Sequence, residues 1–89
     1  MLSLEMKQVT RADLVRILGE PVVAEAERMS PEQFTERKWD RLPELLRVCE
    51  KFYDTSLFEA RRSFLLGLDP DLRRLLVRHL LDEPNQFPL

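Results

Sequence analysis

Signals for the start of a helix recur three times in this chain of 89 residues. In the sequences SPEQ (residues 30–33) and SLFE (residues 56–59), a serine is followed three residues later by Gln or Glu, the spacing of a capping box. Asp69 stands before Pro70, and an acceptor side chain followed by proline is also typical of a helix start. Because starts this close together leave room only for short helices, the sequence predicts an all-α fold of five or six of them.

Apolar spacing and helix-breaking residues set the expected bounds of these helices. Gly19 and Pro21 separate the first two, and Pro43 ends the third because proline disfavours a helical residue before it. Gly67, followed by Leu68, is expected to end the fifth helix in the left-handed conformation. The predicted helices lie within residues 10–19, 21–29, 31–42, 43–53, 56–67 and 70–82.

Short connections between these helices predict one compact bundle, and the length of the chain suits a single domain. We expect the helical domain to span residues 10–82. Residues 1–9, in which Leu2, Leu4 and Met6 alternate with polar residues, lack a partner strand. They are therefore expected to form an extended arm or a frayed helical turn. Residues 83–89, with two prolines, are expected to be a flexible tail.

The composition favours a globular protein, since 44% of the residues are hydrophobic and 34% are charged. The formal net charge of −2 gives no overall attraction to nucleic acid or to an anionic membrane. Cys49 is the single cysteine and cannot form an internal disulfide, and there is no run of 18 apolar residues. We therefore expect a cytoplasmic protein without a membrane partner.

The residues needed for catalysis are scarce in this chain. It has one cysteine, one histidine and no glycine-rich loop that would hold a phosphate. Cys49 lies in the middle of an apolar helix face, where a thiol is expected to pack and not to react. His79 lies on the apolar stripe of the last helix, so we expect it to be partly buried with one hydrogen bond, or else a pH-sensitive or interface residue. With no CxxC pair and no HxxxH spacing, we predict no enzyme, no cofactor and no metal.

Arg61 is a charged residue that the helical pattern places on the apolar face of the predicted helix at residues 56–67. Its neighbours within one turn are Leu57, Phe58, Phe64 and Leu65. A buried guanidinium without a partner is too costly to keep. Arg61 is therefore expected to pair internally, to extend past the edge of the core, or to mark the rim of an interface with another chain.

The last two predicted helices carry more apolar surface than one small core needs. Leu66 lies opposite Leu57, and Val77 and Leu81 fall outside the main apolar stripe of the last helix. We therefore predict a small adaptor, regulatory or assembly subunit that binds another protein or a second copy of itself. The candidate contact residues are Leu57, Arg61, Leu66, Val77 and Leu81.

A nucleic-acid-associated regulator is the alternative function. Its candidate contacts are Arg37, Lys38 and Arg41 on the third predicted helix and Arg74 and Arg78 on the last. Clusters of this kind are needed to neutralise phosphates. Against this alternative, three acidic residues accompany the three basic ones between residues 30 and 42. The sequence therefore favours binding to protein over binding to nucleic acid.

Overall fold

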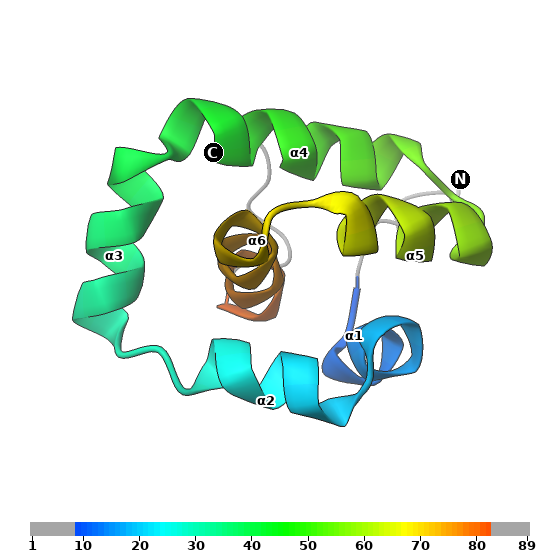
Figure 1. Cartoon of the computed structure of the whole chain (residues 1–89), viewed down its shortest axis with the longest axis horizontal. Coiled ribbons are helices and arrows are strands. Elements are labelled where there is room, and N and C mark those ends of the chain that lie inside the picture. Colours follow the sequence, from blue (N-terminus) through cyan, green and yellow to red (C-terminus); the bar gives the residue numbers. More distant parts are fainter. Residues whose placement is uncertain (1–8, 83–89) are drawn as a thin grey trace, which may run out of the picture.

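The structure, a computed structural model, describes residues 9–82. Six helices and no strand occur in this range, so the predicted all-α fold is confirmed (Figure 1). The helices are α1 (Arg11–Leu18), α2 (Glu20–Glu27), α3 (Pro31–Asp40), α4 (Leu42–Asp54), α5 (Phe58–Gly67) and α6 (Pro70–Asp82). Of the predicted arm at residues 1–9 only Val9 is described, and the predicted tail at residues 83–89 lies outside the described residues.

The last helix, α6, is the centre of the molecule. Figure 1 shows it nearly end-on, with α2, α3 and α4 running around it, and it packs against each of these three helices. Six consecutive residues of α6, from Leu75 to Leu80, are buried. A helix enclosed on several sides must be apolar on several sides, which explains why its apolar residues exceed a single stripe.

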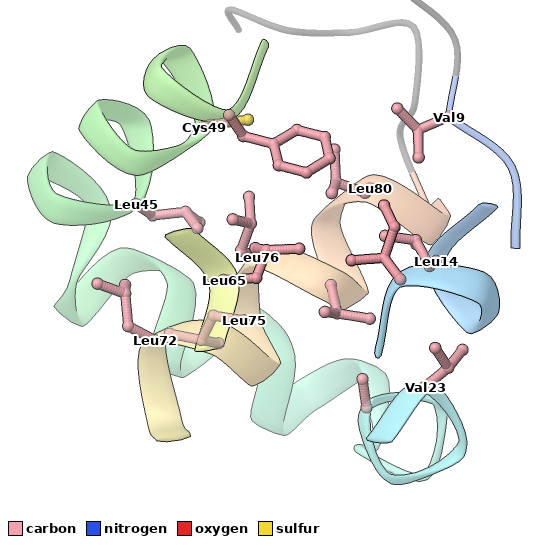
Figure 2. Packing of buried hydrophobic residues seen from close by; sticks show 14 of the residues in the cluster. Val9, Leu14, Val23, Leu45, Cys49, Leu65, Leu72, Leu75, Leu76 and Leu80 are labelled. Carbon is pink, nitrogen blue, oxygen red and sulfur yellow. The ribbon is translucent and has the colours of Figure 1, made fainter. Parts of the chain in front are cut away.

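The core draws side chains from all six helices. Figure 2 shows Leu14, Val23, Leu45, Leu65 and Leu76 converging in one cluster, and each of them is at most 1% exposed. Phe34 of α3 belongs to the same cluster.

Val9, the first residue that the structure describes, lies before the predicted domain boundary at residue 10 and packs against the core. Val9 is only 5% exposed and lies beside the core near Leu14 and Leu80 (Figure 2). The residue that we assigned to the arm is thus part of the domain.

Side-chain caps define the starts of three helices. At α1, the Asp13 amide donates to Thr10 Oγ1 at 3.2 Å while the Thr10 amide donates to Asp13 Oδ2 at 3.0 Å. Ser30 and Gln33 form the same reciprocal pair at α3, at 3.1 and 3.3 Å. At α6, the Leu72 amide donates to Asp69 Oδ2 at 3.0 Å. The starts predicted at Ser30 and Asp69 are therefore confirmed.

Two expected helix ends differ from the structure. Ser56 does not cap α5, because Leu57 occupies the N-cap position and no side chain caps this helix. Gly67 is not a left-handed stop: it is the last helical residue, and Leu68 leaves the helix in extended backbone, with φ −75° and ψ 154°. The glycine with positive φ is Gly19, at 99°, where one residue ends α1 and begins α2.

Candidate interaction surface

Helix α5 leaves most of its apolar side chains in solvent. Leu65 is its only buried residue. Leu57, at the N-cap of the helix, is 72% exposed, Phe58 is 42% exposed and Leu66 is 49% exposed. Phe58 and Leu66 are separated by eight residues of helix, or about 12 Å at 1.5 Å per residue. Leu57 and Leu66 lie on opposite sides of the helix, with Phe58 between them in the helical projection. We call these three side chains, which are distributed around the helix, the α5 surface.

Arg61 of α5 binds groups of its own chain. Its Nε donates to the carbonyl oxygens of Thr55 and, at 3.3 Å, of Phe52, both at the C-terminal end of α4. Its guanidinium also lies 4.5 Å from the centre of the Phe52 ring. Desolvation lowers the pKa of Arg61 from its usual value. Of the alternatives predicted for Arg61, internal pairing is the one observed, and we do not retain this residue as a partner contact.

Two further arginines satisfy helix ends in the same way. Arg62 Nε donates to the Ile17 carbonyl in the last turn of α1, at 3.2 Å. Arg78 Nη1 donates to the carbonyl of Met29 and, at 3.2 Å, to that of Ala26, at the end of α2. The last carbonyls of a helix have no partner within the helix itself. The sequence indicated that Arg61 needed a partner, but no local signal showed that these carbonyls would supply one.

The two predicted contact residues on α6 are covered to different extents. Val77 is 0% exposed, and Leu81 is partly buried against the core. The prediction of an interface at Val77 is wrong for this fold, because the neighbours of a central helix cover the apolar side chains outside its main stripe. Of the five predicted contact residues, Leu57 and Leu66 remain exposed, and Phe58 joins them although the sequence did not single it out.

Ion pairs occupy the arginines at the end of α3. Arg41 contacts Glu44 at 2.8 Å, Asp69 at 3.0 Å and Asp71 at 3.1 Å, and Arg37 contacts Asp71 at 2.6 Å. The hydrogen bonds from Arg41 are the main reason why the pKa of Asp69 falls to about 2. This network joins the start of α4 to the start of α6.

The other residues of the nucleic-acid alternative also face groups of their own chain. Lys38 Nζ lies 5.4 Å from the centre of the Phe34 ring, and Arg74 lies 3.8 Å from a carboxylate oxygen of Glu25. Arg78 is 9% exposed and pairs with Asp82 at 2.8 Å. Acidic side chains of the same chain therefore offset the charge of four of the five candidates, Arg37, Arg41, Arg74 and Arg78.

The thiol and the imidazole both lie inside the bundle. Cys49 is 0% exposed, and burial raises the pKa of its thiol to about 12, so the reactive thiolate is scarce near neutral pH. His79 is 2% exposed, more deeply buried than expected. Residues 9–82 contain no group of three or more His, Cys, Asp or Glu side chains that is suited to hold a metal ion.

Across residues 9–82, none of the helices combines the length and apolar character needed to cross a bilayer.

Comparison of the chain with models of protein families, with curated proteins and with solved structures found no match.

Proposed function

We propose that this protein is a small non-enzymatic interaction module, an adaptor, regulatory or assembly subunit, that binds another protein through the α5 surface. One observation carries the proposal: a single helix exposes Leu57, Phe58 and Leu66 at 72, 42 and 49% while it buries only Leu65. Full burial of a large apolar side chain contributes about 1.5–3 kcal/mol. In the isolated domain the side chains of the α5 surface are largely in solvent, so most of this free energy would be gained only when a partner buries them.

The attachment of α5 supports the same proposal. Arg61 and Arg62 tie the helix to the ends of α4 and α1, and Leu65 anchors it in the core. These contacts use the inner side of α5. The exposed apolar side chains are thus presented on a helix whose position is already fixed, and binding to a prearranged surface loses less entropy than binding to a mobile segment.

Site-specific photo-crosslinking tests the proposal. A photoreactive phenylalanine analogue is placed at Leu57 or at Leu66, and in a matched control at Trp39, which is 63% exposed but lies on α3. We expect a crosslinked protein from both α5 positions and none from position 39. Phe58→Asp should abolish the product formed at the neighbouring position 57, because a buried charge at the contact costs several kcal/mol.

Other outcomes separate the alternatives. Equal crosslinking at position 39, or none at either α5 position, contradicts the proposal. A product of twice the mass of the chain identifies a second copy as the partner. The nucleic-acid alternative predicts instead that recovery of the product depends on intact nucleic acid and falls steeply with salt.

A further inference from the structure

A polar surface pocket lies where the end of α2, the start of α3 and the middle of α6 meet. Its volume is about 280 Å³. The lining residues are Glu25, Arg28, Met29, Gln33 and Arg74. In Figure 1 the α2–α3 corner lies on the opposite side of α6 from α5, so this pocket is separate from the α5 surface.

Two arginines in the pocket have guanidinium N–H groups that are available to donate hydrogen bonds. The Arg28 side chain is exposed and makes no hydrogen bond or ion pair with another residue between 9 and 82. Arg74 Nη2 is 3.8 Å from Glu25 Oε2, which is longer than a hydrogen bond. By contrast, Arg11 pairs with both Glu20 and Glu27 at 2.7 Å. The pocket therefore concentrates two incompletely used guanidinium groups around one carboxylate.

The remaining polar groups of the pocket also favour an anion. Gln33 Oε1 accepts a hydrogen bond from the Ser30 amide, which leaves the side-chain NH₂ as a donor. The carbonyls of Ala26 and Met29, at the same end of α2, already accept from Arg78. These contacts reduce the number of free acceptors that would repel an anion.

We propose that this pocket binds the phosphate group of a phosphomonoester. Arg28 and Arg74 would each donate two hydrogen bonds to phosphate oxygens, the geometry in which guanidinium groups bind phosphate best, and Gln33 would add a third donor group. Glu25 is the competitor: its side chain is 57% exposed, so it is free to turn into solvent when a dianion replaces it at Arg74. The proposal does not depend on the function assigned to α5.

An NMR titration of the full chain with inorganic phosphate tests this site. The titration is run at about pH 8, where the phosphate group is a dianion, and is compared with sodium chloride at equal ionic strength. We expect saturable shifts confined to Arg28, Gln33 and Arg74, with a dissociation constant in the millimolar range. A parallel titration with phosphoserine should saturate at the same residues.

Three variants and a control give the expected changes in affinity. Arg28→Gln and Arg74→Gln should each weaken phosphate binding about 10-fold, since each removes charge-assisted hydrogen bonds. Glu25→Gln should strengthen binding several-fold because it removes the competing carboxylate. Arg16→Gln, at an exposed position on α1, should leave the affinity unchanged.

The proposal is overturned if the shifts grow linearly with phosphate and occur at exposed arginines in general, because this is the pattern of ionic screening. It is equally overturned if both arginine variants retain the affinity of the original chain, or if Glu25→Gln weakens binding. All of these variants change side chains outside the core, so a chemical-shift map that is otherwise unchanged verifies their fold.

Discussion

At the scale of single residues, arginine side chains donate hydrogen bonds to the carbonyl groups at the C-terminal ends of three helices. Arg61, Arg62 and Arg78 reach the C-terminal carbonyls of α4, α1 and α2 from sequence distances of up to 52 residues. The guanidinium suits this task because its long stem packs on apolar surface while its head donates several hydrogen bonds. Arg61 on an apolar face was detectable in the sequence, but its acceptors depend on the packing of α4 beside α5.

Replacing Arg61 by methionine should destabilise the fold. Arg61→Met keeps an apolar stem but removes the donors to Thr55 and Phe52 and the charge above the Phe52 ring. We expect the free energy of unfolding to fall by about 1.5–3 kcal/mol, as for a lost hydrogen bond to a charged group. Urea denaturation measures this change, with Arg16→Met as the exposed control. Unchanged stability together with lost partner binding would instead place Arg61 in the interface.

At the scale of the helices, α5 and α6 look alike in sequence and differ in the fold. Both are apolar on more than one side, and the sequence therefore grouped Leu57 and Leu66 with Val77 and Leu81 as partner contacts. Helical periodicity shows which sides of a helix are apolar, but not how many neighbours will cover them. In the structure α6 buries seven residues and α5 one, so of these two helices it is α5, with its N-cap residue, that leaves large apolar side chains exposed.

This difference predicts that α5 opens before the rest of the domain. It has no side-chain N-cap and a single buried residue, and segments with few buried contacts unfold locally at low free energy. In native-state hydrogen exchange, amides in the middle of α5 should show an opening free energy a few kcal/mol below that of Leu76 and Leu80 in α6. The same opening free energy and urea dependence in both helices would show that they unfold together.

Gly67→Ala offers a selective control for local opening. Gly67 is helical, and a Cβ added there meets nothing within 4 Å. Alanine should therefore stabilise α5 by about 0.5 kcal/mol through its higher helix propensity. We expect slower exchange in α5 and little change in α6. Faster exchange in α5 would mean that the glycine is required by the fold.

At the scale of the whole molecule, the sequence predicts the class of fold and the approximate bounds of the helices, but not their arrangement. Caps at Ser30 and Asp69 act within four residues, so they are visible in the sequence. The central place of α6 depends on contacts with α2, α3 and α4 along much of the chain. The same limit applies to charge, because Arg41 meets Asp69 and Asp71 only after α3 and α6 have packed.

These charge networks predict that the fold loses stability in acid. Hydrogen bonds from Arg41 and, to a lesser extent, from the Leu72 amide lower the pKa of Asp69 from 3.8 to about 2. Hydrogen bonds from Arg11 lower the pKa values of Glu20 and Glu27 below 4.5. Between about pH 4.5 and pH 2 the unfolded chain therefore binds more protons than the folded chain. The stabilisation present above the unfolded pKa values is thus lost as pH falls through the folded values.

The midpoint of urea denaturation should therefore decline as the pH is lowered from about 4.5 to about 2. The decline should be smaller at high salt, because the participating side chains are largely exposed and their interactions are screened. Asp69→Asn keeps a side-chain oxygen for the Leu72 amide but removes the titrating group, so it should flatten the lower part of the profile. A midpoint that rises towards pH 2, or a profile that Asp69→Asn leaves unchanged, would show that these pairs do not connect protonation to folding.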